Sequence, residues 1–230
     1  MVNYSTQLHT LELGPMENFI YLIEDCATAT AAVVDPAWEV EKIIDYAAER
    51  KLKITAIILT HGHNDHINGV ESLQQKSGAK VYINTIEAKF FGLENMDWSS
   101  FDAPFKIDLG STEILAVETP GHTPGGVCYY TDGNLITGDT LFVYGCGRCD
   151  LDGSDPVAMF HSLHGLLDQF DPETRVFPGH NYSIDKSSTL KQERAGNPFM
   201  HFDDEESFTK YRMELHDQTR SAPYGPMENS

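Results

Sequence analysis

The sequence predicts a mixed α/β (α+β) protein in which two β-sheets pack face to face with helices on the outside. The first observation is that short apolar, β-branched runs occur in two groups, each interleaved with segments of helical periodicity. The second is that several runs end in glycine-rich stretches that carry histidine or aspartate. Such strand ends can converge only if two sheets present them to one rim, as a sandwich does. The 230 residues, 40% of them hydrophobic, supply ample core.

The first half of the chain alternates strands and helices. Aspartate is a good N-cap and proline suits a first turn, so Asp35-Pro36 should open a helix. Its apolar residues recur at helical spacing from Val40 to Ala47. A later helix should end at Gly78. The other elements expected here are strands over residues 5–13, 18–24, 28–34, 54–59 and 80–83, helices over 70–75 and 85–91, and an ordered loop over 92–104.

The second half repeats the pattern and then changes character. Asp132-Gly133 is a hairpin signal between two strands, and Ser154-Asp155-Pro156 caps a helix that runs to Phe170. Strands are expected over residues 111–117, 127–131, 135–137 and 175–177, with a glycine-rich loop over 138–153. Residues 183–230 are polar and charged, with helices expected near 188–194 and 205–215. The chain is therefore divided into residues 1–182 and a short, partly helical C-terminal extension, 183–230.

Charge and hydropathy exclude several classes of partner. The net charge is −19, from 35 acidic and 16 basic residues. Such a surface repels phosphate backbones and anionic lipid, so neither nucleic acid nor a membrane is expected as a partner. No apolar run reaches the length of a membrane span, and the first ten residues do not have the pattern of a signal peptide. The expected location is the cytoplasm.

The four cysteines are too few for a disulfide scaffold at this length. Cys146 and Cys149 form a C-x-x-C, but they stand in a glycine-rich loop rather than at the helix start that a redox pair favours. A zinc ribbon would need a second C-x-x-C, and the sequence has none. The cysteines therefore do not point to the function.

The stretch from Thr60 to His66, Thr-His-Gly-His-Asn-Asp-His, is the strongest functional signal. It directly follows a buried strand, in which side chains alternate faces, so His61 and His63 can point the same way. Once the chain turns, Asp65 and His66 can reach a neighbouring spot. Imidazole and carboxylate suit zinc, iron and manganese. The stretch predicts two metal ions side by side at a strand end.

Three further strand ends each deliver one ligand of the same type. His122 lies in Thr-Pro-Gly-His-Thr-Pro-Gly, Asp139 in Thr-Gly-Asp-Thr, and His180 in Pro-Gly-His-Asn-Tyr. Glycine permits the sharp turns that aim one side chain inward. Four strand ends should therefore meet at one metal site.

In this order, these motifs resemble those of the metallo-β-lactamase-fold superfamily over roughly residues 4–182. The resemblance implies an αββα sandwich of two mixed sheets, with residues 1–182 as the catalytic domain. It places a buried, structural acid at Asp35. It also implies two divalent ions, zinc first, with iron or manganese as alternatives. The first ion would be held by His61, His63 and His122, the second by Asp65, His66 and His180, and Asp139 would bridge them.

Residues 137–142 and 145–148 are similar to the glyoxalase II (hydroxyacylglutathione hydrolase) subgroup. The similarity implies hydrolysis of a small-molecule thioester, free or bound to a carrier protein, by a hydroxide between the two ions. Asp65 and Asp139 would be catalytic, with Asp65 orienting the water. Arg148 replaces a family lysine, and Tyr182 matches a family tyrosine. Both residues are therefore expected to bind substrate.

Other functions stay open on the same residues. Gly145 to Arg148, followed by an aspartate, also resembles persulfide dioxygenases, which use O₂ and one iron that would map to His61, His122 and Asp139. The loop and tail also resemble zinc-dependent hydrolases of bacterial polyketide clusters, which act on carrier-bound acyl chains. An inactive metal-stabilised scaffold is disfavoured because every ligand position is filled.

Overall fold

Strand β2 (Asn18–Asp25) shows how the chain builds two cores from one sheet. Phe19, Tyr21 and Ile23 point to one face, where they meet side chains of the second sheet. Ile20 and Leu22 point to the other face, where they meet helices. All five are at most 2% exposed, so the strand is buried on both sides. The computed structural model that shows this describes residues 5–220 and 222–227.

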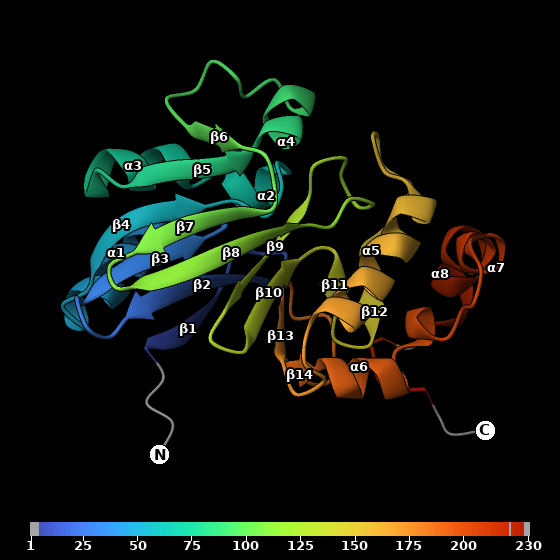
Figure 1. Ribbon diagram of the computed structural model, residues 1–230. Coiled ribbons are helices and arrows are strands. Elements are labelled where there is room, and N and C mark those ends of the chain that lie inside the picture. The colour runs from blue at the N-terminus through green and yellow to red at the C-terminus, as the bar shows by residue number, and fades with distance from the viewer. Residues whose placement is uncertain (1–4, 221, 228–230) are drawn as a thin grey trace.

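Two mixed six-stranded sheets form the centre of the described chain (Figure 1). The first has the order β1-β2-β3-β4-β5-β6, antiparallel from β1 to β3 and parallel from there on. Its remaining strands are β1 (Thr6–Leu13), β3 (Thr30–Val34), β4 (Lys53–Ile58), β5 (Lys80–Asn84) and β6 (Ser99–Phe101). The parallel strands β3, β4 and β5 end at one edge, which is where the metal motifs begin.

The second sheet has the order β14-β13-β10-β9-β8-β7, and its only parallel pair among the described strands is β10 with β13. The strands are β7 (Phe105–Leu109), β8 (Thr112–Glu118), β9 (Val127–Thr131), β10 (Asn134–Gly138), β13 (Arg175–Pro178) and β14 (Ser188–Thr189). The hairpin β11 (Leu141–Phe142) and β12 (Gly145–Cys146) stands apart from both sheets. Asp132 and Gly133 both have positive φ at the β9–β10 turn, as the hairpin signal predicted.

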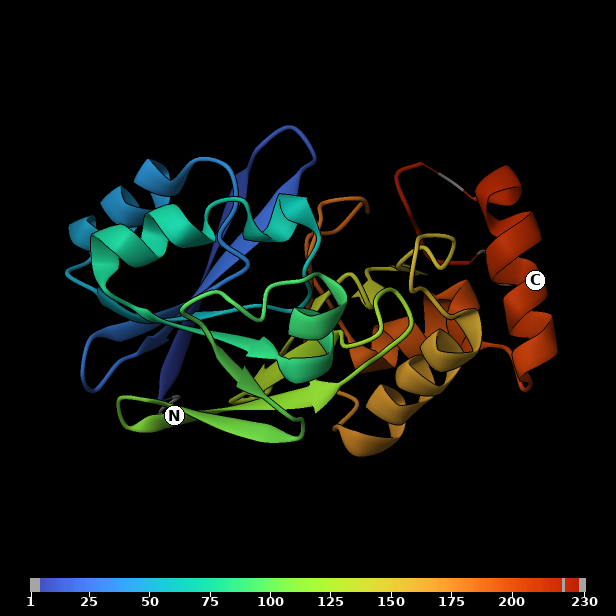
Figure 2. The ribbon, with the colours of Figure 1, turned by 90° about the horizontal axis from the view of Figure 1, so that it is seen from above.

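Helices cover the outer face of each sheet, so the fold is the predicted αββα sandwich. Seen from above, α1 (Val40–Glu49) and α3 (Val70–Ser77) lie on one side and α5 (Pro156–Gln169) on the other (Figure 2). Helix α5 begins at the predicted cap, because the Asp155 carboxylate accepts from the N–H groups of Val157 and Ala158. No helix in the described ranges is both long and apolar enough to cross a membrane.

The C-terminal extension completes the second outer layer. It contributes edge strand β14, then α6 (Leu190–Gly196), a short 3₁₀ turn (Pro198–Met200), α7 (Glu205–Lys210), a π-helical turn (Tyr211–Leu215) and α8 (His216–Thr219). Phe199 and Phe208 pack into the cluster under α5. The extension returns to its own start, since Tyr224 N–H donates to the Tyr182 carbonyl and Ile184 N–H donates to the Tyr224 carbonyl. The domain boundary at residue 182 stays a prediction.

Several sequence expectations were wrong. Asp35 does not cap a helix: it has φ +49°, and α1 begins at Val40 after Glu39. Its carboxylate instead accepts from the N–H and hydroxyl of Thr60, beside the metal motif. The expected loop 92–104 contains β6, strand β7 follows where none was predicted, and the loop 138–153 contains β11 and β12. These strands were missed because each is short or stands beside glycine and proline.

Candidate metal centre

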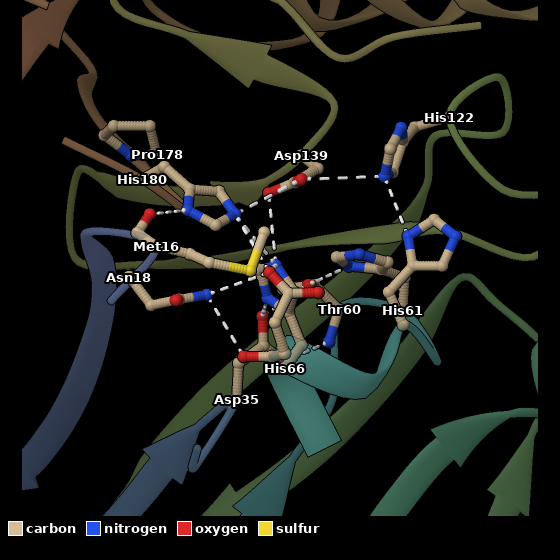
Figure 3. A network of polar contacts seen from close by, with 12 residues as sticks. Met16, Asn18, Asp35, Thr60, His61, His66, His122, Asp139, Pro178 and His180 are labelled. Atoms are coloured by element: carbon tan, nitrogen blue, oxygen red, sulfur yellow. Dashed lines mark hydrogen bonds and ion pairs between the residues drawn. The ribbon is translucent and has the colours of Figure 1, made fainter. Parts of the chain in front are cut away.

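The predicted ligands come from loops at one rim of the sandwich, where the two sheets join. Figure 3 shows the side chains of His61, His66, His122, Asp139 and His180 gathered there. Thr60, just beyond β4, makes this junction because its carbonyl accepts from Val127 N–H at the start of β9. His63 is the N-cap of the four-residue helix α2 (Asn64–Ile67), which holds Asp65 and His66. His122, Asp139 and His180 follow β8, β10 and β13 respectively.

The first ligand group is His61, His63 and His122. One ring nitrogen of each lies within 4.8 Å of the others. His63 Nδ1 is 3.0 Å from His122 Nε2. His122 is oriented by its Nδ1, which lies 2.9 Å from the Arg148 carbonyl. The buried Nε2 of His61 has no hydrogen-bond partner within the described ranges. The ring nitrogens of the three histidines therefore converge at a point where the described protein groups do not provide a hydrogen-bond partner for each of them.

The second group is Asp65, His66 and His180, again with ligand atoms within 4.8 Å. His66 Nε2 is 3.2 Å from His180 Nε2 and 3.5 Å from Asp65 Oδ2. Their other ring nitrogens face oxygens, with His66 Nδ1 3.0 Å from Asp35 Oδ2 and His180 Nδ1 2.8 Å from the Met16 carbonyl. Such contacts fix the tautomer of a metal ligand.

Asp139 lies between the two groups. Its carboxylate is 3.4 Å from His66 Nε2 and 3.5 Å from the Nε2 atoms of His122 and His180. Its Oδ1 has no hydrogen-bond partner within the described ranges. Gly179 leaves room for it, because a Cβ there would lie 2.4 Å from Asp139 Oδ1. A carboxylate with two oxygens in this position can face both groups.

The charge state of the cluster suits a divalent cation. Burial lowers the pKa of His61 well below its usual value, and burial together with His122 lowers that of His63 to about 4. Burial also lowers the pKa of His66, but Asp139 and Asp35 outweigh it and raise the pKa to about 9. Burial alone would raise the pKa of Asp139, but His180 and His66 outweigh this effect and hold the pKa of Asp139 well below its usual range. A cation would replace the proton that the carboxylates hold on His66.

A third set, Asp35, His61 and His66, also lies within 4.8 Å. Geometry argues against it as a metal site, because the Asp35 carboxylate is already occupied by Thr60 N–H, Thr60 hydroxyl and His66 Nδ1. Asp35 is instead the buried structural acid that the resemblance implies. The unpartnered atoms of His61 and Asp139 fit two cations held by the other two sets.

Two residues that support the site were not predicted. Glu87 of α4 (Thr85–Phe90) is fully buried, and its two oxygens accept from the N–H groups of Gly62 and Gly125, which joins two ligand loops. Asn18 donates to the carbonyl and carboxylate of Asp65. Neither residue stands in a motif, so the sequence carried no signal for them.

A pocket of about 800 Å³ opens beside the cluster and is lined in part by residues of the C-terminal extension. Tyr182 lines it and stacks on His180, with ring centroids 4.6 Å apart. Arg148 also lines it, and its exposed guanidinium forms a two-pronged contact with Asp150. The structure thus brings all seven predicted ligands together beneath a pocket that both predicted substrate residues border. Their roles remain predictions.

The family model, the sequence relatives and the solved structure that match this chain agree with one another. Residues 13–180 match the family described as the metallo-beta-lactamase superfamily. The chain is 36% identical over 195 residues to the probable polyketide biosynthesis zinc-dependent hydrolase PksB of Bacillus subtilis, covering 85% of this chain and 87% of that one. It is 35% identical over 183 residues to a hydroxyacylglutathione hydrolase of Shewanella baltica, covering 79% of this chain and 67% of that one. The crystal structure of ETHE1 from Myxococcus xanthus is similar with a TM-score of 0.83, 28% identity and 91% coverage of both chains.

Proposed function

Since this chain belongs to the metallo-beta-lactamase superfamily, we propose that it hydrolyses a thioester with two divalent ions, zinc first. Its relatives include metal-dependent hydrolases of this superfamily. The observation that carries the proposal is the Asp139 carboxylate, seated between two complete three-residue ligand groups. Bound there, two divalent ions would acidify a water molecule and polarise a carbonyl oxygen.

The protein's own groups would orient the reactants. Asn18 holds the Asp65 carboxylate by a 3.2 Å hydrogen bond, so Asp65 can accept a proton from the attacking water and fix its direction. Tyr182 and Phe142 give the pocket an aromatic wall, with ring centroids 5.4 Å apart. A thiolate leaves readily from a tetrahedral intermediate, so the chemistry requires no strong general acid.

The names of two relatives support a thioester, free or carrier-bound. Hydroxyacylglutathione is itself a thioester, and a polyketide pathway builds its chains on carrier-protein thioesters. A cytoplasmic location, where such substrates are made, remains part of the proposal.

The alternative is a mononuclear iron dioxygenase that acts on a persulfide. It is favoured by one observation: His61 Nε2 and Asp139 Oδ1 are both unpartnered within the described ranges, and His122 Nε2 lies 3.5 Å from the Asp139 carboxylate. Those three residues would suffice for one iron. The complete second group of Asp65, His66 and His180 favours hydrolysis.

Elemental analysis together with a substrate screen tests the proposal. The purified protein should contain about two divalent ions per chain and hydrolyse at least one of lactoylglutathione, acyl-coenzyme A or an acyl-carrier thioester. Asp139→Ala should lose both metal and turnover, while the exposed control Asp152→Ala should keep both. One iron per chain with oxygen consumption on glutathione persulfide, and no thioester turnover, would establish the alternative. Full turnover by Asp139→Ala would refute the bridging role.

A further inference from the structure

The pocket beside the metal cluster, including the wall that the C-terminal extension contributes, gathers an unusual share of positive charge for so acidic a protein. Of the six arginines in the chain, three line this pocket: Arg148, Arg212 and Arg220. No lysine does so among the described residues. Arginine differs from lysine in presenting a planar fork that matches phosphate and carboxylate groups. Two of the three, Arg212 and Arg220, come from the C-terminal extension.

Arg212 is the central member because it is buried and only partly satisfied. Its side chain is 5% exposed. Its Nη1 donates to His216 Nδ1 at 2.6 Å. Burial and Arg212 lower the pKa of His216 to about 4, so this imidazole accepts the bond without offsetting the charge. The buried Nε–H of Arg212 has no acceptor within the described ranges, although the residue lines the pocket, so its hydrogen-bonding capacity is not filled by the protein.

The nearby acids do not balance the arginines. Asp217 lies 3.5 Å from Arg212 Nη2 and 4.0 Å from Arg220 Nε, so two guanidinium groups share one carboxylate. That carboxylate is 65% exposed, and water therefore weakens its attraction. Arg148 is paired separately with Asp150. Glu17 also lines the pocket, but it belongs to the β1–β2 turn beside the metal cluster. One positive charge remains without a partner on this wall.

We propose that Arg212 and Arg220 form a subsite for an anionic group, phosphate or carboxylate, carried by the substrate at the far end of the pocket from its reacting carbonyl. This inference rests on the proposed hydrolase function, because it takes the metal end of the same pocket as the place of reaction. It names a substrate class that the metal ligands do not: thioesters with an anionic handle. It also gives the C-terminal extension a role in substrate choice.

Four thioesters test the subsite with the metal-replete enzyme. Acetyl-pantetheine is neutral, acetyl-4′-phosphopantetheine carries a phosphate, acetylglutathione carries carboxylates on its thiol half, and succinyl-pantetheine carries one on its acyl half. At least one anionic member should have a KM at least about tenfold below that of acetyl-pantetheine, as expected for a charged hydrogen bond. The member that shows the effect identifies the anion and the half that carries it.

The variants locate the effect. Arg212→Gln should abolish the KM advantage of the anionic thioester over acetyl-pantetheine. Arg220→Gln, at a 43% exposed side chain, gives a second measurement should Arg212→Gln fail to fold. Arg194→Gln is the matched control, because this exposed arginine of α6 contacts the Leu167 carbonyl away from the pocket. Equal KM values for all four thioesters, or an advantage that survives in both variants, would overturn the inference.

Calorimetric binding of the products separates this inference from the proposed function. Phosphopantetheine or glutathione should bind more tightly than pantetheine, or succinate more tightly than acetate if the acyl half carries the anion, and Arg212→Gln should remove the difference. If no thioester is hydrolysed but this difference is present, the subsite stands and the hydrolase proposal fails. If neutral and anionic thioesters are hydrolysed alike and the products bind alike, the hydrolase stands and the subsite is wrong.

Discussion

Replacing Glu193 by glutamine should change how the stability of the protein depends on pH. Glu193 of α6 is fully buried, and its carboxyl group accepts from Tyr144 N–H at 2.9 Å, Asn197 Nδ2 at 2.8 Å and Ser188 Oγ at 2.5 Å. It thereby ties the extension to the loop between β11 and β12. Glutamine has the same shape and can satisfy all three partners, with its NH₂ group donating to Ser188 Oγ.

The magnitude follows from the pKa. Burial raises the pKa of Glu193 from 4.5 to about 7, against the lowering effect of its hydrogen bonds. A raised pKa in the folded state means that Glu193 stabilises the fold most below pH 4.5, and that this contribution is lost as the pH rises through 7. The difference between the two pKa values corresponds to about 3 kcal/mol.

The assay is denaturant unfolding of wild type and Glu193→Gln between pH 4.5 and 8.5. The subtraction cancels the titration of all other groups. Relative to their difference at the acid end, the glutamine variant should gain about 3 kcal/mol over wild type at the alkaline end, most of it below pH 7.5. Glu206→Gln, at an exposed position of α7, should run parallel to wild type. A difference that is flat with pH, or that grows in the opposite direction, would refute the buried-carboxyl reasoning.

Of three further predictions, two concern the candidate metal centre and one concerns a control position in helix α5. Gly179→Ala should reduce metal content and turnover, because the new Cβ would lie 2.4 Å from Asp139 Oδ1; elemental analysis and kinetics measure this, and full metal content would contradict it. Gly165→Ala in α5, where no atom lies within 4 Å of the new Cβ, should instead raise the unfolding free energy by about 0.5–1 kcal/mol without changing turnover. Asp35→Asn should weaken metal affinity by about 10–100-fold, because His66 loses its carboxylate partner; competition with a chromophoric chelator reads this out, and unchanged affinity would count against the orienting role.

The fold was predictable where the period of the pattern was long enough to read. Buried strands such as β2 and β4 are continuous apolar runs, and α5 carries both a cap and an apolar stripe. Strand β7 has a clear alternation, Phe-Lys-Ile-Asp-Leu, but it directly follows Pro104 and no element was predicted there. Asp35-Pro36 was misread because a capping sequence is a local signal, whereas its positive φ is imposed by contacts across the sheet.

The sequence pointed to the side chains that the structure gathers in the candidate metal centre, because metal chemistry needs particular side chains beside glycine at strand ends. Their supports were not predictable. Glu87 acts on Gly62 and Gly125, which are far from it in the sequence, so only the folded chain brings the three together. The same is true of Arg212, whose pocket wall forms only when the extension packs on α5. A sequence motif indicates the chemistry of a side chain, whereas the folded structure determines which groups that side chain contacts.

The backbone hydrogen bond from Tyr224 N–H to the Tyr182 carbonyl joins the beginning and the end of the C-terminal extension. These two ends lie beside the pocket, while helix α7 between them packs against α5. Insertions or exchanges within the helices of the extension can therefore alter the pocket rim without moving the strand ends that carry the ligands. The predicted ligands and the pocket wall from the extension therefore lie on separate parts of the chain, which can be engineered, and can evolve, independently.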